Sequence, residues 1–117
     1  MGDNFERDMS LTLFEVLEVV HKLDPDHLEI ATNHEKTALF LMNHILGDED
    51  VIKILCDLNE NNYVKGPVPD DKQSPKRNKP VWIFKANWQG LIIYIKFKIF
   101  ITKNKIYVIS FHEDERI

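Results

Sequence analysis

The sequence predicts a single α+β domain, with N-terminal helices packed on one face of a C-terminal antiparallel sheet. The chain has 117 residues, which is enough for one hydrophobic core. Apolar residues recur at three- and four-residue spacing in the first half, whereas residues 81–112 alternate with a period of two. Apolar residues make up 44% and charged residues 29%, as in ordinary folded domains. We therefore expect a helical part (1–62), a Pro-rich basic loop (63–80) and an antiparallel meander (81–112).

Three helices are expected in the first part. The first begins after the N-cap Ser10 and ends at Pro25. The second is expected over residues 33–46 and stops at Gly47, and the third begins at Asp48. The apolar residues that should face the core are Leu13, Val16, Leu17, Val20 and Leu23 in the first helix, Leu39, Met42, Ile45 and Leu46 in the second, and Val51, Ile54, Leu55 and Leu58 in the third.

The middle of the chain differs in composition. Residues 66–80, GPVPDDKQSPKRNKP, hold four of the five prolines, which excludes a regular helix or a central strand. The net charge of −4 hides a split: residues 1–62 hold 14 acidic and 4 basic residues, and residues 63–117 hold 5 and 11. This asymmetry indicates an anionic ligand on the second half, although charge placed unevenly without a function is the alternative.

Strands are expected over residues 81–88, 91–101 and 106–112, with a hairpin turn at Gln89-Gly90. In the second strand, LIIYIKFKIF, one face is apolar and the other carries Tyr94, Lys96 and Lys98. An aromatic ring and two cations on an outward face can stack a nucleobase and hold phosphates. The alternative is structural, since lysines deter aggregation and tyrosine favours strands.

The register of the last hairpin decides which way His112 points. A three-residue turn around a left-handed Asn104, or a bulge of the same parity, places His112 opposite Lys96 on the outward face and buries Phe111 beside Phe97. A two-residue turn places His112 on the buried face. We predict the first register, because an unpaired buried imidazole costs a few kcal/mol.

RNA cleavage without a metal requires a base for the 2′-hydroxyl proton, a cation for the charged intermediate and an acid for the leaving oxygen. Lys, Tyr and His can fill these roles, and His112 ends the last strand beside Glu113 and Asp114. A surface histidine before a charged tail is the alternative. The five histidines lack metal-site spacing, so we expect no metal and no organic cofactor.

The remaining features indicate a cytoplasmic protein. No apolar run approaches the roughly 18 residues needed to span a bilayer, and the acidic N-terminus lacks the layout of a signal peptide. The single cysteine, Cys56, forbids an internal disulfide and is expected to be buried.

The tract VWIF…YIKFKI…YVISFHE resembles the C-terminal half of the MqsR family, the mRNA-cleaving toxins of bacterial toxin–antitoxin pairs, which have a RelE-like fold. The likeness extends upstream through LNENNYVKGP and covers roughly residues 35–115. It implies that the family's loop lysine corresponds to Lys65, its strand tyrosine and the neighbouring lysine to Tyr94 and Lys96, and its final lysine to His112. The family has Trp-Gln-Asp where this chain has Trp82-Ile83-Phe84, so an active-site glutamine is missing.

The resemblance implies an endoribonuclease that cleaves mRNA without a metal and is neutralised by an antitoxin protein. The expected catalytic residues are His112, Tyr94, Lys96 and Lys65. Further phosphate contacts are expected from Lys98, Lys76, Arg77 and Lys79, which should form one positive surface with Lys65 and Lys96. The alternative function is a non-catalytic binding protein, such as an immunity or inhibitor protein that uses its acidic helices.

Overall fold

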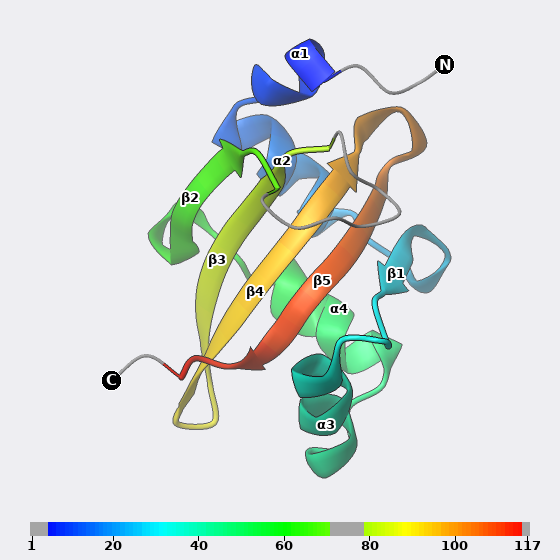
Figure 1. Ribbon diagram of the computed structural model, residues 1–117, viewed down its shortest axis with the longest axis vertical. Coiled ribbons are helices and arrows are strands. Elements are labelled where there is room, and N and C mark those ends of the chain that lie inside the picture. Colours follow the sequence, from blue (N-terminus) through cyan, green and yellow to red (C-terminus); the bar gives the residue numbers. More distant parts are fainter. Residues whose placement is uncertain (1–4, 71–78, 116–117) are drawn as a thin grey trace.

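In residues 5–70 and 79–115, which the computed structural model describes, five strands form one mixed sheet in the order β1-β5-β4-β3-β2 (Figure 1). The strands are β1 (Leu28–Ile30), β2 (Tyr63–Val68), β3 (Val81–Trp88), β4 (Leu91–Phe100) and β5 (Lys105–Glu113). Strands β2 to β5 are antiparallel neighbours, whereas β1 runs parallel to β5. The α+β class is confirmed, but β1 and β2 were not predicted, and residues 63–68 form a strand rather than part of a loop.

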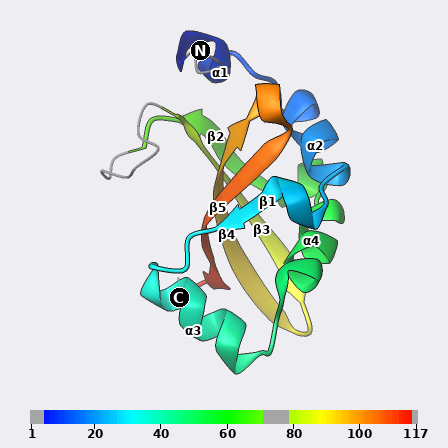
Figure 2. The same ribbon diagram turned by 90° about the vertical axis from the view of Figure 1, so that its right-hand side faces the viewer.

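Four helices accompany the sheet in the same described ranges: α1 (Phe5–Met9), α2 (Leu13–His21), α3 (Glu35–Asn43) and α4 (Asp48–Cys56). Helices α2 and α4 lie together on one face of the sheet, as Figure 2 shows edge-on. Helix α3 packs against β5 near one end of the sheet, and α1 lies at the opposite end. The predicted start of α4 is confirmed, whereas α1 was not foreseen.

The N-cap of α2 is Thr12, so the predicted cap Ser10 is wrong. The Thr12 hydroxyl accepts from the Glu15 amide at 3.1 Å, and the Glu15 carboxylate accepts from the Thr12 amide at 2.8 Å. This reciprocal pair satisfies two amides at the free end of the helix. Ser10 instead donates its hydroxyl to the Arg7 carbonyl at the end of α1.

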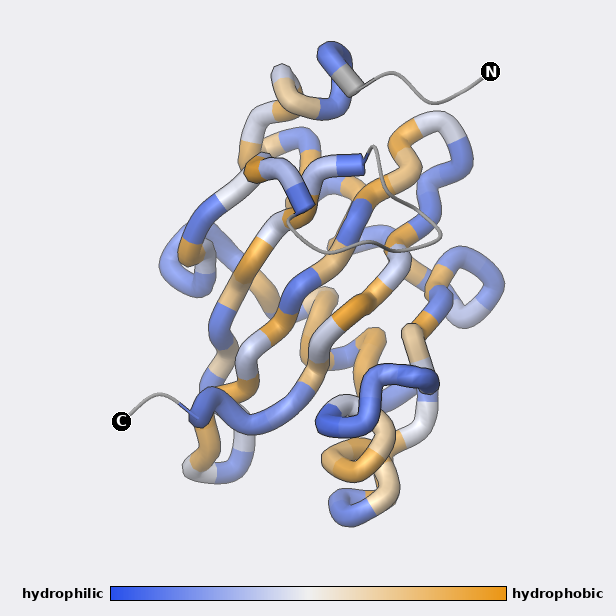
Figure 3. The backbone as a smooth tube through the Cα atoms, in the orientation of Figure 1, coloured by the Kyte–Doolittle hydropathy of each residue, from blue (hydrophilic) through white to orange (hydrophobic). Residues whose placement is uncertain are grey.

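The core lies between the sheet and the helix pair α2 and α4. Its largest fully buried side chains include Phe84, Phe97, Phe111 and Leu55. Along β4 hydrophobic and hydrophilic residues alternate, which Figure 3 shows as changing colour along the strand. The period-two pattern therefore correctly identified the face that packs on the helices.

The predicted buried stripe of the second helix is wrong. Leu39, Met42 and Ile45 are 44%, 66% and 88% exposed, while Thr37 and Phe40 are buried. The physical reason is that α3 touches β5 through a narrow face and leaves the rest of its surface uncovered. Helix α3 ends at Asn43, so Gly47 is not its stop but the N-cap of α4.

A turn and a strand position require unusual backbone conformations. Gln89 and Gly90 both have positive φ, 49° and 83°, which confirms the predicted tight hairpin between β3 and β4. Gly66 in β2 has φ 138°, and a Cβ there would lie 2.9 Å from Cα of Trp82. Only glycine allows β2 to approach β3 this closely.

The register between β4 and β5 changes once along the hairpin. Near the turn Lys98 pairs with Tyr107, but beyond an irregularity between Lys96 and Phe97 the pairs are Lys96 with Ser110 and Tyr94 with His112. The predicted opposition of Lys96 and His112 is therefore wrong by two residues. Beyond the irregularity the parity is as predicted, so His112 and Lys96 share a face. The predicted three-residue turn is wrong, because Phe100 pairs with Lys105, and Phe111 is buried opposite Ile95 instead of Phe97. Asn104 is left-handed, as predicted, at φ 50°.

Cys56 closes α4 and is half-buried rather than fully buried. Its Sγ lies 3.6 Å from the Val20 carbonyl, and burial raises the pKa of the thiol, so the thiol form predominates near neutrality. Among the described residues, no helix combines the length and apolar character needed to cross a bilayer.

Candidate active site

A cleft opens on the outer face of the sheet, defined as the face turned away from α2 and α4. It has a volume of about 410 Å³. Its lining comes from β4, β5 and the start of α3: Tyr94, Lys96, Ile109, Ser110, His112, His34, Glu35 and Lys36. Three of the four predicted catalytic residues, Tyr94, Lys96 and His112, therefore meet in one place.

Tyr94 and His112 are direct cross-strand partners in this cleft. Their ring centroids are 5.6 Å apart and the planes are tilted by 30°. Lys96 lies two residues along β4 on the same face, opposite the buried Ser110. The arrangement combines an imidazole, a phenol and an ammonium group, which can supply the base, the acid and the cation that metal-free phosphodiester cleavage requires.

The environment of Tyr94 keeps its phenol protonated. Burial raises the pKa of Tyr94 above its ordinary value of 10.0, and the nearby Asp114 carboxylate raises it further. Asp114 itself forms an ion pair with Lys85 at 2.9 Å, and Lys85 is the β3 partner of Tyr94. A protonated phenol is a hydrogen-bond donor at neutral pH, so Tyr94 is suited to donate rather than to remove a proton.

His34 is the cleft residue that sequence reasoning missed as a candidate. It is the N-cap of α3, and its ring stacks on His112 with centroids 5.7 Å apart and an interplanar angle of 9°. Predicting the helix from residue 33 placed His34 inside it, so no signal marked it as a ligand-facing residue. Only the docking of α3 on β5 brings the two histidines together.

Thr37 explains why α3 docks there. Strand β1 covers the outer edge of β5 only as far as Val108. Beyond that point the Thr37 hydroxyl accepts from the buried Phe111 amide at 3.0 Å. This bond satisfies a backbone donor that no neighbouring strand reaches, and it positions the α3 N-terminus over the end of β5.

Lys65 lies outside the cleft. It pairs with Ile83 on β3, which in turn pairs with Lys96, so the two lysines occupy one cross-strand row. Two strand spacings separate them, which is about 10 Å. Lys65 is exposed and can contact a neighbouring phosphate of a bound strand, but not the group held between Tyr94 and His112.

The predicted continuous positive surface is wrong for the residues that the structure describes. Lys98 is fully buried and forms an ion pair with Asp70 at 2.9 Å. Lys79 is 3% exposed and pairs with the buried Asp8 at 2.6 Å. Neither ammonium group is placed to contact a phosphate, because each is buried against a carboxylate. Lys76 and Arg77 lie outside the described residues.

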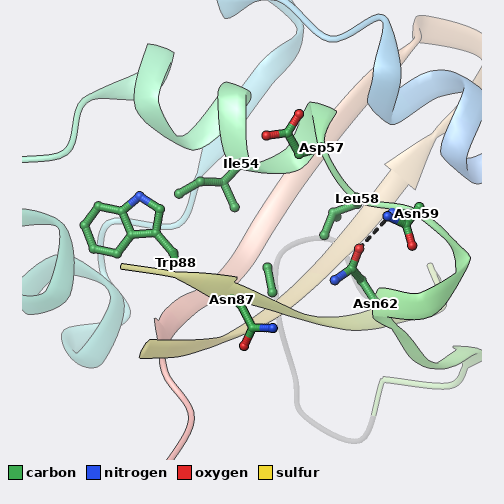
Figure 4. A pocket seen from close by; sticks show the side chains of 8 residues that line it. Ile54, Asp57, Leu58, Asn59, Asn62, Asn87 and Trp88 are labelled. Carbon is green, nitrogen blue, oxygen red and sulfur yellow. Dashed lines mark hydrogen bonds between the residues drawn. The ribbon is translucent and has the colours of Figure 1, made fainter. Parts of the chain in front are cut away.

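A second hollow, of about 230 Å³, lies between the end of α4 and β3 (Figure 4). Its two amides from the segment after α4 hold the chain: Asn59 accepts from the Asn61 amide at 2.8 Å, and the Asn62 side chain accepts from the Asn59 amide at 2.9 Å and donates to the Lys85 carbonyl at 3.0 Å. Within residues 5–70 and 79–115, no three His, Cys, Asp or Glu side chains are grouped to hold a metal ion.

Comparison of the chain with protein-family models, with curated proteins and with solved structures finds no match in any of the three.

Proposed function

We propose that this protein is a metal-independent endoribonuclease that cleaves single-stranded mRNA, acting as an MqsR-like toxin with a RelE-like fold. The observation that carries the proposal is the convergence of Tyr94, Lys96 and His112 in one cleft on the outer face. The resemblance of the same residues to the MqsR pattern supports it. The toxin would act in the cytoplasm, and an antitoxin protein would neutralise it.

The proposed chemistry assigns one role to each residue. The RNA 2′-oxygen attacks the adjacent phosphorus while its proton passes to Nε2 of His112. The bond from phosphorus to the 5′-oxygen breaks, and that oxygen takes the proton of the Tyr94 hydroxyl. Lys96 stabilises the negative charge on the pentacoordinate phosphorus. The products are a 2′,3′-cyclic phosphate and a 5′-hydroxyl, and the proton on His112 returns to the tyrosinate through solvent.

Two contacts suit this site to RNA. The Tyr94 ring can stack a nucleobase next to the scissile phosphate, an interaction that every base can make. Lys65, about two strands away in the same row, would hold a flanking phosphate. The structure removes Lys79 and Lys98 from the proposed interface, and Lys76 and Arg77 remain expectations.

The test is cleavage of a synthetic single-stranded RNA by the purified protein in the presence of a metal chelator. His112→Ala and Tyr94→Phe should each lower the rate by about 100- to 10,000-fold, the usual contribution of an acid or base. Expression of the parent should arrest bacterial growth, and both variants should relieve the arrest. His27→Ala, outside the cleft, is the matched control and should cleave like the parent. A parent that neither cleaves RNA nor arrests growth contradicts the proposal.

The second candidate is an immunity or inhibitor protein that binds a basic site. It is favoured by the exposed carboxylates of the helical part, among them Glu15, Glu18, Asp48, Glu49 and Asp57. Charge complementarity of this kind would accelerate association with a basic partner. A harmless parent whose expression protects cells from a basic nuclease toxin would select this function, and loss of that protection in a Glu15→Gln, Glu18→Gln variant would locate the surface.

A further inference from the structure

The two histidines of the cleft hold their protons on different nitrogens. His112 Nδ1 lies 2.9 Å from the Glu113 carbonyl oxygen. A carbonyl only accepts hydrogen bonds, so Nδ1 carries a proton. In the neutral ring the lone pair is then on Nε2, the nitrogen that a base uses.

His34 has the opposite tautomer. The backbone amide of Thr37 donates to His34 Nδ1 at 3.3 Å, as in a helix N-cap. An amide N–H only donates, so Nδ1 is the acceptor and the proton of His34 is on Nε2. The Thr37 hydroxyl lies 2.9 Å from the same Nδ1 and 3.5 Å from the Ile109 carbonyl oxygen, and because Nδ1 is the nearer acceptor we assign the hydroxyl proton to it.

The cleft is therefore lined by one histidine whose Nε2 can accept a hydrogen bond and one whose Nε2 can donate one, with the rings stacked 5.7 Å apart. We infer that His34 is a further catalytic residue of this site, which donates Nε2–H to a non-bridging oxygen of the scissile phosphate. This inference rests on the proposed function. His34 keeps its proton throughout the reaction, while the 2′-hydroxyl proton goes to His112 and the leaving oxygen is protonated by Tyr94.

The donor matters most when charge accumulates on the phosphate. A fixed N–H aimed at a developing oxyanion stabilises the transition state more than the ground state. The helix cap fixes the His34 ring, because its Nδ1 is hydrogen-bonded to both the amide and the hydroxyl of Thr37. Thr37 is itself held in place by β5, since its hydroxyl accepts from the Phe111 amide. Removal of the donor should consequently lower kcat more than it raises KM.

Two substitutions separate the cap from the donor. In His34→Asn the amide oxygen is attached to Cγ, as Nδ1 is, so it can cap α3, but the Nε2–H is lost. In His34→Gln the amide nitrogen reaches the position of Nε2 and keeps a donor, but the cap is lost. We expect His34→Asn to unfold like the parent and to cleave RNA about 100- to 1,000-fold more slowly. His34→Gln should melt several degrees lower and retain most of the cleavage rate.

A substrate with sulfur in place of one non-bridging oxygen gives an independent readout. Sulfur accepts hydrogen bonds weakly, so one of the two diastereomers should be cleaved more slowly by the parent. In His34→Asn this difference should disappear, which a purely structural role of His34 would not produce.

The outcomes separate the role of His34 from the ribonuclease activity on which it rests. If the parent cleaves RNA, His112→Ala does not, and His34→Asn cleaves at the parental rate, the inference is overturned and the proposed function stands. The inference is also overturned if His34→Asn and His34→Gln lose the same fraction of the cleavage rate and melt at the same temperature as each other. A parent without ribonuclease activity overturns both.

Discussion

The two ends of the outer face both carry a lysine of β4, but one end is an open cleft and the other is buried. At one end Tyr94 and Lys96 line an open cleft with His112. At the other end Lys98, two residues further along β4, is fully buried against Asp70, and Lys79 is buried against Asp8 of α1. The Phe100 ring belongs to the covered end, where Lys79 Nζ lies 5.1 Å from its centroid.

The difference shows that a lysine on a strand face is not by itself a phosphate site. Lys96 and Lys98 point to the same side of β4, but Asp70, just after β2, pairs with Lys98, and Asp8 of α1 pairs with Lys79 at the same end. Burial then converts one cation into part of a buried ion pair, which contributes to the packing of the fold instead of binding a ligand. The cleft end is bordered instead by α3, which packs on β5 and supplies part of the cleft lining.

The largest expected effect is on the covered end. Lys98→Ala leaves the Asp70 carboxylate, 7% exposed, without its partner at 2.9 Å. We expect the free energy of unfolding in urea to fall by about 3–5 kcal/mol. The double variant Lys98→Met, Asp70→Leu removes both charges and should recover most of this loss. A loss below about 1 kcal/mol in the single variant would mean that the pair is not buried in solution.

The next largest effect is on the cleft end, and it should be catalytic instead of structural. Lys96→Gln should reduce RNA cleavage by about 100- to 1,000-fold, since it removes a charge that stabilises the transition state. Its free energy of unfolding should change by less than about 1 kcal/mol. Lys53→Gln, exposed on α4 across the molecule, is the control and should leave both quantities unchanged. If Lys96→Gln unfolds the protein, the two ends do not differ as described.

The smallest expected effect is that one tyrosine at each end, Tyr94 and Tyr107, loses its phenol proton at a higher pH than an ordinary tyrosine. Burial raises the pKa of Tyr94 and of Tyr107, and the carboxylates of Asp114 and Glu29 respectively raise them further. Because the unfolded phenols release their protons first, stability should be retained below about pH 10 and should fall as the pH rises through the folded pKa values.

Ultraviolet titration of the folded protein checks this directly. Tyr94→Phe and Tyr107→Phe should each remove one phenol from the late part of the titration curve. A variant that instead loses absorbance change below the ordinary tyrosine pKa would show that its phenol is not shielded in the fold.

Local patterns predicted much of the fold. The bounds of β3, the turn at Gln89-Gly90 and the first residue of α4 agree with the structure. These features depend on alternation, on positive φ at adjacent residues and on acidic residues in a first turn, which are properties of neighbouring residues. Strand β1 was not predicted, because three residues are too few to show an alternating pattern. Its parallel pairing also depends on β5, which lies far along the chain.

The sequence by itself determined that Tyr94, Lys96 and Lys98 share one face of β4, because side chains alternate with every residue of a strand. The turn alone did not place His112 there: the pairs next to the turn have the opposite parity, and the irregularity between Lys96 and Phe97 returns His112 to that face. Only the tertiary structure decided that Lys98 would be buried against Asp70 and that His34 would stack on His112. The physical reason is that local backbone geometry sets the face of a strand to which a side chain points. Whether that side chain is then buried, and which other side chains it contacts, depends on packing between segments that are distant in the chain.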